Sequence, residues 1–237
     1  MSQFADSDGL SNNSLTTGGI LLDSSSKYHS VRLRIAMFGK RSLDVAVSSL
    51  AMLFLLPLLT VVMATLLIVQ GRPIFISRGR VGRGGTNFPC FKFRTMVTNA
   101  EETLREYLSH NENALKEWRD TQKLKNDPRI TPLGHFLRKS SLDELPQLMN
   151  VLRGEMSLVG PRPIVRDEMA RYGDYIEDYL QVRPGITGLW QVSGRSDLSY
   201  ENRVELDVRY VREWNLWLDT VIIAKTVPAV LRSEGAR

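Results

Sequence analysis

The sequence predicts an α/β domain that is anchored to a membrane by an N-terminal helix-break-helix hairpin. The first observation is an uncharged, mostly aliphatic stretch from Val45 to Gln70, which has the length and composition of a membrane segment. The second is a glycine-rich turn followed by the alternating, strand-like residues Phe88–Arg94. The third is apolar residues at helical spacing, at Leu104, Leu108, Leu115 and Trp118 and again at Val204, Val208 and Val211. Strands and helices are therefore both expected after the membrane segment.

The first part of the chain is expected to be a flexible tail. Residues 1 to about 30 are rich in Ser, Gly, Asn and Asp and have few large apolar residues at any regular period. With 237 residues, the chain has room for one compact domain plus one extra element. We therefore expect a tail over 1–39, a membrane hairpin over 40–71 and a domain on the cytoplasmic face over 72–237.

The membrane segment allows two arrangements. As a straight helix it would reach about 39 Å, which is enough to cross a bilayer. Pro57, however, lies near its middle and divides it into halves that are each about one leaflet deep. Basic residues precede and follow the segment in equal measure, so the positive-inside rule favours neither orientation: Arg32, Arg34, Lys40 and Arg41 before it, and Arg72, Arg78, Arg80 and Arg83 after it. We expect a re-entrant hairpin that breaks at Pro57 rather than a single span.

Composition narrows the class of partner. The formal net charge of +5 suits an anionic partner, such as nucleic acid, a phosphorylated small molecule or an anionic membrane surface. No recognition helix, zinc finger or RNA-binding aromatic platform is visible, so no nucleic-acid partner is expected. The single cysteine, Cys90, excludes an intramolecular disulfide, and its apolar neighbours predict that it is buried. The three scattered histidines indicate neither a metal cluster nor a catalytic triad.

Two adjacent carboxylates make the segment Ser141–Pro146 the most informative part of the chain. Asp143 and Glu144 are followed shortly by Arg162, which lies between two prolines. Acids that face a phosphate need nearby positive charge, so this grouping points to phosphoryl chemistry on an anionic substrate. A structural interpretation is compatible with it: Ser141 and Glu144 have the spacing of a capping box, or Asp143 itself caps the helix.

Two further segments have a predicted orientation. In Phe88–Arg94, alternation places Lys92 and Arg94 on one face and the phenylalanines on the other, so that two cations are presented together. The preceding glycines are typical of a hairpin turn and not of a nucleotide-binding loop. Near the C-terminus, Trp214 and Trp217 lie on a helix with flanking cations, which suits an amphipathic helix at a membrane interface and ordinary core packing about equally.

Six motifs together carry a family resemblance. In chain order they are Lys40–Asp44, Lys92–Met96, Asp127–Thr131, Ser141–Leu148, Gly154–Pro163 and Arg183–Gly188. With them the sequence resembles the bacterial sugar transferases, monotopic phosphoglycosyl transferases that move a sugar phosphate from a nucleotide sugar to polyprenyl phosphate. The resemblance covers about 40–232. The short form with one hairpin is similar to the undecaprenyl-phosphate galactose phosphotransferases of exopolysaccharide synthesis.

The resemblance implies roles for individual residues. Asp143 is the nucleophile that attacks the sugar-linked phosphate, and polyprenyl phosphate then attacks the resulting phosphosugar intermediate. Glu144 is the second catalytic residue and helps to hold Mg²⁺. The residues expected to contact the substrate phosphates are Arg162, Lys92, Arg94 and Arg129. Those expected to shape the nucleotide-sugar pocket are Arg183, Gly185, Gln191, Arg195 and Asp207, although the glycines serve turns equally well.

The same resemblance supplies the expected partners and location. They are a UDP-sugar donor, undecaprenyl phosphate as acceptor, and membrane lipid at the cytoplasmic face of the bacterial inner membrane. Galactose is the first expectation for the sugar and glucose the second, and a homodimer is left open. One departure concerns Leu56, because many relatives have serine before the hairpin proline. The rival hypothesis is an inactive, membrane-anchored scaffold that only recruits polysaccharide-assembly partners.

Overall fold

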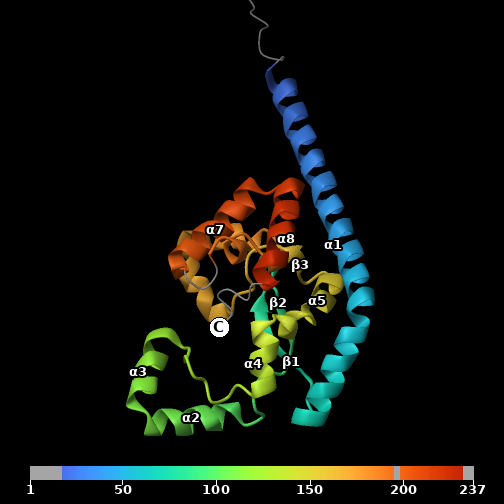
Figure 1. Cartoon of the computed structure of the whole chain (residues 1–237). Helices are drawn as coiled ribbons and strands as arrows, with labels where there is room; N and C mark the ends of the chain where they lie inside the picture. The colour runs from blue at the N-terminus through green and yellow to red at the C-terminus, as the bar shows by residue number, and fades with distance from the viewer. Residues whose placement is uncertain (1–17, 195–197, 232–237) are drawn as a thin grey trace, which may run out of the picture. The chain divides into compact units, whose positions relative to one another are not determined.

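The computed structural model describes residues 18–194 and 198–231 of the chain (Figure 1). It separates into two units, one that ends at Lys40 and one that begins at Arg41. All contacts described below lie within the second unit, which contains every predicted site residue.

The N-terminal helix is longer than the expected membrane hairpin. Helix α1 runs from Gly18 to Gln70 without interruption and so includes residues 18–39 of the segment expected as a flexible tail. No proline occurs between Gly18 and Leu56 to end the helix earlier. The expected reversal of direction at Pro57 is also absent, since the helix continues through this residue.

The continuity of α1 has a simple cause. A proline removes the one hydrogen bond that its own nitrogen would donate, and the backbone bonds on either side can remain. One turn later, the Thr60 hydroxyl donates to the Leu56 carbonyl at 2.8 Å. The part from Ala36 to Gln70 is long and apolar enough to cross a membrane, and little of it is buried inside the protein. Several of its large side chains are exposed, among them Leu50, Leu53, Phe54, Val61 and Ile68.

A β-hairpin follows the helix and confirms the predicted glycine turn. Strand β1 (Phe75–Val81) pairs antiparallel with β2 (Asn87–Phe93), and a short 3₁₀ turn η1 (Arg83–Gly85) joins them. Gly84 and Gly85 have φ angles of 66° and 77°, in the left-handed region that glycine adopts without strain. In the register of the pair, Arg78 lies opposite Cys90.

Helices make up most of the remaining chain. They are α2 (Ala100–His110), α3 (Glu112–Thr121), α4 (Pro132–Lys139), α5 (Gln147–Arg153), α6 (Ile176–Leu180), α7 (Tyr200–Glu213) and α8 (Leu216–Leu231), with 3₁₀ segments η2 (Leu142–Glu144), η3 (Arg166–Tyr175) and η4 (Trp190–Val192). Strands β3 (Ser157–Val159) and β4 (Gly185–Thr187) form a second, parallel pair. Within the described ranges the strands thus form two small sheets, and helices supply most of the packing.

Strand β2 is packed between elements that are far apart in the sequence. Phe93, at its end, is buried against Leu66 of α1 and Leu137 of α4. Cys90 is buried against Val151 of α5, as expected from the sequence. This double packing holds the strand that carries Lys92 in a fixed position.

The two C-terminal tryptophans have different environments. The Trp214 indole nitrogen donates to Asp219 at 3.1 Å, and its ring packs against a buried cluster around Val159 and Tyr210. Trp217 is 74% exposed. Core packing thus describes Trp214, whereas Trp217 has the exposure that an interfacial residue needs.

Polar contacts attach both ends of the apolar part of α1 to the same unit. At the first end, Arg41 donates to the carbonyls of Val151 and Leu152 at 2.6 and 3.0 Å, which caps α5. Asp44, also at this end, is buried and accepts hydrogen bonds at 2.8 Å from the Ser157 hydroxyl and at 3.0 Å from the Leu158 amide. We call these contacts the first clamp.

The second clamp lies at the C-terminal end of α1. The buried Arg94 guanidinium donates to the carbonyls of Gln70 and Gly71. The Gln70 side chain donates to the Thr131 hydroxyl at 2.9 Å. A cation at a helix C-terminus satisfies carbonyls that the helix leaves unpaired and favours the dipole. The second clamp therefore fixes the end of α1 beside strand β2 and helix α4.

Candidate active site

The paired carboxylates lie in a tight connection between α4 and α5. Thr131 caps α4, since its hydroxyl accepts from the Gly134 amide at 2.9 Å, and Pro132 begins the helix. Ser141 then adopts a left-handed conformation with φ 57°, and η2 carries Asp143 and Glu144. The capping-box interpretation is wrong, because the Ser141 side chain makes no capping bond. The Ser141 backbone is in the left-handed region, whereas a residue that caps a helix N-terminus usually has an extended conformation.

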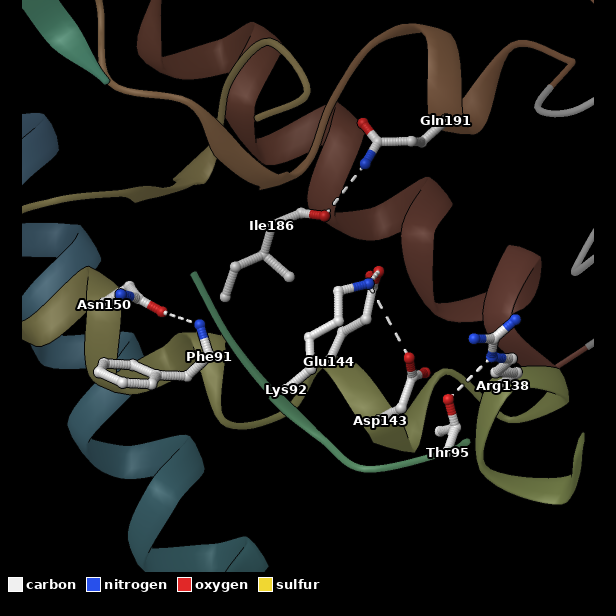
Figure 2. Close-up of polar contacts among 9 residues, drawn as sticks. All are labelled: Phe91, Lys92, Thr95, Arg138, Asp143, Glu144, Asn150, Ile186 and Gln191. Atoms are coloured by element: carbon white, nitrogen blue, oxygen red, sulfur yellow. Dashed lines mark hydrogen bonds and ion pairs between the residues drawn. The ribbon is translucent and has the colours of Figure 1, made fainter. Parts of the chain in front are cut away.

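Lys92 joins strand β2 to both acids. Its ammonium lies 2.5 Å from a Glu144 oxygen and 3.8 Å from an Asp143 oxygen. Figure 2 shows the lysine reaching from β2 toward the two carboxyl groups of η2. The structure thus brings together three predicted site residues that come from two separate elements.

The two adjacent acids have different protonation behaviour. Burial raises the pKa of Asp143 to about 6, and Glu144 adds to this, while Lys92 and Arg138 oppose it. For Glu144, burial is outweighed by the paired Lys92 ammonium, which lowers the pKa. Asp143 is only 7% exposed. A buried carboxylate with few hydrogen bonds is a better nucleophile than one that is fully solvated or tightly paired.

Arg138 is a site residue that the sequence analysis missed. Its Nε donates to the Thr95 hydroxyl at 2.9 Å, and both residues lie beside Asp143 in Figure 2. Among the described residues, the terminal nitrogens of Arg138 have no hydrogen-bond partner. Burial lowers the pKa of this guanidinium, and the Asp143 charge is the largest factor that raises it. Its place in the last turn of α4, shortly before Asp143, was the available signal.

Arg94 and Arg129 were predicted to contact phosphate, but the structure gives them other partners. Arg94 forms the second clamp and is buried, so Lys92 and Arg94 do not present two cations together. Arg129 donates from Nε and a terminal nitrogen to both oxygens of Asp127, at 2.8 and 2.6 Å. It also stacks on Trp118, with its guanidinium carbon 5.0 Å from the ring centre.

Arg162 is exposed and close to the carboxylates. Its charge, together with those of Lys92 and Arg80, lowers the pKa of Glu144 against the effect of burial. The loop that carries it is fixed by backbone bonds: Gly160 N donates to Thr187 O at 2.9 Å, and Gly185 N donates to Pro161 O at 2.8 Å. Lys92, Arg138, Arg162 and Arg80 are therefore cations that act on one or both members of the acid pair.

Gly185 and Gln191 stabilise the backbone near the loop that carries Arg162. A Cβ at Gly185 would lie 2.1 Å from the Gly160 nitrogen, so only glycine allows this contact between β3 and β4. The Gln191 amide donates to the Ile186 carbonyl at 3.0 Å (Figure 2). Both residues therefore stabilise the backbone of β4 and its contact with β3, and their place in a nucleotide-sugar pocket stays a prediction.

Asp207 and Arg183, also predicted for the pocket, lie in different surroundings. Asp207 is buried and accepts from the Tyr172 hydroxyl at 2.8 Å. Burial raises its pKa to about 7, although this hydrogen bond and the nearby Arg162 backbone amide oppose the shift. Arg183 instead donates to the Gly154 carbonyl at 2.7 Å, next to Arg41 of the first clamp. Arg195 lies outside the described residues.

The acid pair suits a Mg²⁺ ion that is held partly by the protein and partly by the substrate. Over the described ranges, no group of three or more His, Cys, Asp or Glu side chains could hold a metal ion. Mg²⁺ is commonly held by one or two protein carboxylates together with substrate phosphate oxygens. The adjacent carboxylates of Asp143 and Glu144 match this mode if the substrate supplies the remaining ligands.

Known proteins match this chain over most of its length. A family model for bacterial sugar transferases matches residues 35–233. The chain is 50% identical over 202 residues to the exopolysaccharide production protein ExoY of Rhizobium meliloti (strain 1021), a match that covers 85% of this chain and 89% of the relative.

Two longer relatives carry names that mention a lipid carrier. The chain is 51% identical over 203 residues to an undecaprenyl-phosphate galactose phosphotransferase of Salmonella typhimurium, covering 86% of this chain and 42% of that protein. It is 38% identical over 213 residues to an undecaprenyl-phosphate glucose phosphotransferase of Komagataeibacter xylinus, covering 84% of this chain and 37% of that protein. With a family model that matches nearly the whole of the described chain, this protein belongs to the bacterial sugar transferase family of enzymes.

Proposed function

We propose that this enzyme transfers hexose-1-phosphate from a UDP-sugar to undecaprenyl phosphate and so begins the assembly of an exopolysaccharide repeat unit. The observation that carries the proposal is the buried Asp143 carboxyl, with its pKa near 6, in a site surrounded by Lys92, Arg138 and Arg162. The names of the relatives support galactose as the sugar first and glucose second.

The reaction takes place in two displacements at phosphorus. An Asp143 oxygen attacks the phosphate that bears the sugar, the bond from this phosphorus to the bridging oxygen breaks, and uridine monophosphate leaves with the electron pair. A phosphate oxygen of undecaprenyl phosphate then attacks the same phosphorus, and the Asp143 carboxylate leaves. Lys92 and Arg138 offset the negative charge that gathers when anionic substrates approach the carboxylate. One buried carboxylate thus separates the encounters with two anions.

Glu144 and Asp143 would hold the Mg²⁺ that we propose as cofactor. When bound, this ion neutralises diphosphate charge and makes the nucleotide a better leaving group. In the structure the Lys92 ammonium is paired with Glu144. Glu144 would become available to Mg²⁺ if the ammonium paired with a substrate phosphate oxygen instead. The Lys92 side chain is about one-third exposed and has a flexible stem, which suits such an exchange.

The position of α1 supports a one-sided attachment to the membrane. Both clamps attach α1 to the unit that carries Asp143, one through Val151 and Ser157 and the other through Arg94. A helix that crossed the bilayer would carry one clamp to the opposite side, away from its partners. We therefore propose that the apolar part of α1 enters the membrane without crossing it, with both ends at the cytoplasmic face and any bend located at Pro57.

Thiol labelling in intact cells tests this topology. Cysteines placed at Ser30 and Arg83 in a Cys90→Ser background should both resist a membrane-impermeant reagent, because both ends of the apolar segment are expected in the cytoplasm. Permeabilised cells provide the control, in which both positions should react. Labelling of the Ser30 position alone in intact cells would establish a single span with the N-terminus outside.

A covalent adduct provides the test of the activity. Detergent-solubilised protein is incubated with Mg²⁺ and either UDP-galactose or UDP-glucose, and uridine monophosphate release and intact protein mass are measured. Without lipid we expect one hexose phosphate added to the protein, and with undecaprenyl phosphate we expect the adduct to disappear as lipid-linked sugar forms. The inactive scaffold is the second candidate. It would give neither nucleotide release nor adduct with either donor.

A further inference from the structure

A second group of cations extends outward from Arg162. We call Arg162, Arg171 and Arg203 the outer arginine cluster. The guanidinium carbons of Arg162 and Arg203 lie 5.7 and 5.1 Å from the centre of the Trp190 ring, and that of Arg171 lies 3.6 Å from the centre of the Tyr200 ring. The loop before η3, η3 itself and α7 supply one arginine each. These guanidiniums are thus brought together from different segments of the chain.

The electrostatics of the cluster favour an anion. Burial lowers the pKa of Arg203, and the charges of Arg162 and Arg171 lower it further, so both of these cations act on Arg203. Among the described residues, neither Arg162 nor Arg171 forms an ion pair. Gathering like charges costs free energy that a bound anion would recover.

Two of the nearby acids, Glu168 and Asp207, are engaged with other groups. Glu168 lies 3.8 Å from Arg80 and accepts from the Val165 amide at 3.0 Å. Asp207 lies beneath the loop of Arg162 and accepts from Tyr172. The acids named here therefore do not occupy the outward side of the cluster.

The aromatic rings support the guanidiniums. Trp190 is 6% exposed, so a ligand base has no room to stack on it. Its indole Nε1 is buried and has no hydrogen-bond partner among the described residues. A guanidinium that lies over a ring directs its N–H groups along its edges, where they can donate to phosphate oxygens. Arg203 is further held by donation from Nε and a terminal nitrogen to the Leu198 carbonyl at 3.2 and 3.0 Å.

The position of the cluster indicates which substrate it serves. Arg162 acts electrostatically on Glu144, so the cluster begins at the catalytic carboxylates and continues toward η3 and α7. Leu142, next to Asp143, packs instead in the apolar group formed by Leu66 of α1 and Leu137. An acceptor with a long hydrocarbon chain suits the side of α1, and a charged nucleotide suits the side of the cluster.

We propose that the outer arginine cluster binds the phosphate of the nucleoside monophosphate leaving group, and so serves the donor and not the lipid acceptor. The inference rests on the function proposed above. When the bond between the sugar-linked phosphorus and the bridging oxygen breaks, that oxygen takes the electron pair and the nucleotide phosphate gains negative charge. Arg171 and Arg203 stabilise this charge by donating N–H groups to the departing phosphate.

The test compares the two half-reactions in Arg171→Gln and Arg203→Gln. The donor concentration that gives half the maximal rate of single-turnover uridine monophosphate release is measured without lipid and serves as the donor KM, and the dissociation constant of uridine monophosphate itself is measured by titration. A charge-assisted hydrogen bond contributes roughly tenfold in affinity. We expect both quantities to rise about tenfold in each variant. Preloaded enzyme should transfer its phosphosugar to undecaprenyl phosphate at the wild-type rate. Arg209→Gln is the matched control, since Arg209 is exposed on α7 and pairs with Glu213 at 3.0 Å.

The outcomes separate this inference from the function on which it rests. Wild-type donor KM and nucleotide affinity in both variants would overturn the inference, and so would a defect confined to transfer from preloaded enzyme to lipid. If Arg203→Gln loses its fold because Leu198 is released, the exposed Arg171→Gln decides alone. Absence of nucleotide release and adduct in the wild type would instead reject the proposed function.

Discussion

Replacing Asp143 with asparagine should abolish sugar-phosphate transfer and, at neutral pH, make the protein more stable. Asparagine keeps the shape of the side chain but cannot form the acyl phosphate, so neither adduct nor nucleotide release is expected. The gain in stability follows from burial, which raises the pKa of Asp143 to about 6. In the unfolded chain an aspartate has a pKa of about 3.9.

The pH dependence of stability follows from this difference between the folded and unfolded pKa values of Asp143. The folded protein holds the Asp143 proton more tightly than the unfolded chain does, so stability falls as pH rises from about 4 to about 6 and then levels off. Above pH 6 the ionised carboxylate costs roughly 3 kcal/mol of unfolding free energy, which asparagine avoids. We therefore expect Asp143→Asn to be more stable than the wild type at pH 7.5 by up to about 3 kcal/mol, and to lose this advantage near pH 4.

Denaturant unfolding at pH 4.5, 6 and 7.5 measures the difference. Asp167→Asn is the control, since it removes the same charge from an exposed position on η3. Full transfer activity in Asp143→Asn would remove Asp143 as the nucleophile. An inactive variant that is no more stable than the wild type at pH 7.5 would mean that the carboxylate is not held at a free-energy cost.

Gly160→Ala should cause the largest loss of stability of any single methyl addition in the loop that carries Arg162. A Cβ at this position would lie 2.5 Å from the Arg183 carbonyl oxygen and 2.8 Å from the Gly185 nitrogen. Both are backbone atoms, so β3 and β4 would have to separate and the bond from Gly160 N to Thr187 O would be strained. We expect a loss of about 3 kcal/mol or more in unfolding free energy, and loss of transfer even in the fraction that folds.

Gly79→Ala is the matched control on strand β1. There a Cβ would meet only the Asn87 side chain, at 3.1 Å, which can rotate away. Thermal unfolding of both variants, with uridine monophosphate release measured on the folded protein, distinguishes the two positions. Equal melting temperatures for Gly160→Ala and the wild type would show that β3 and β4 separate at little cost.

The adjacency of Asp143 and Glu144 could be read from the sequence because it is local, and their catalytic roles stay predictions. The role of Arg94 could not be read in this way. The alternation that aligns Lys92 with Arg94 holds only while the strand continues, and β2 ends at Phe93. The partners of Arg94 are carbonyls at the end of a helix more than 20 residues earlier, so only tertiary packing shows the contact.

For Arg129 and Arg138, unlike Arg94, the neighbouring sequence did contain a signal of their surroundings. Asp127 stands two residues before Arg129, and this short separation was a local signal that the arginine is already paired. Arg138 was overlooked because it precedes the motif and looks like an ordinary cation in the last turn of a helix. Its importance depends on the turn at Ser141, which folds η2 back toward α4.

The course of α1 at Pro57 could not be predicted from the sequence for a different reason. Pro57 was interpreted as a break because it lacks one backbone donor, but a helix tolerates that loss when its neighbours remain bonded. Whether such a site bends depends on the surrounding solvent and packing, which the residue itself does not encode.

The short distance between Lys92 and Arg94 has a consequence for engineering this enzyme. Lys92 contacts Asp143, Arg94 holds the carbonyls of Gln70 and Gly71 at the end of α1, and only Phe93 separates the two cations. Residues two apart in a chain can be separated by at most about 7 Å. A displacement of the helix end therefore acts directly on the lysine. Chimeras in which α1 is exchanged for another anchor should keep their catalytic rate only if the junction at Gln70 and Gly71 is grafted unchanged.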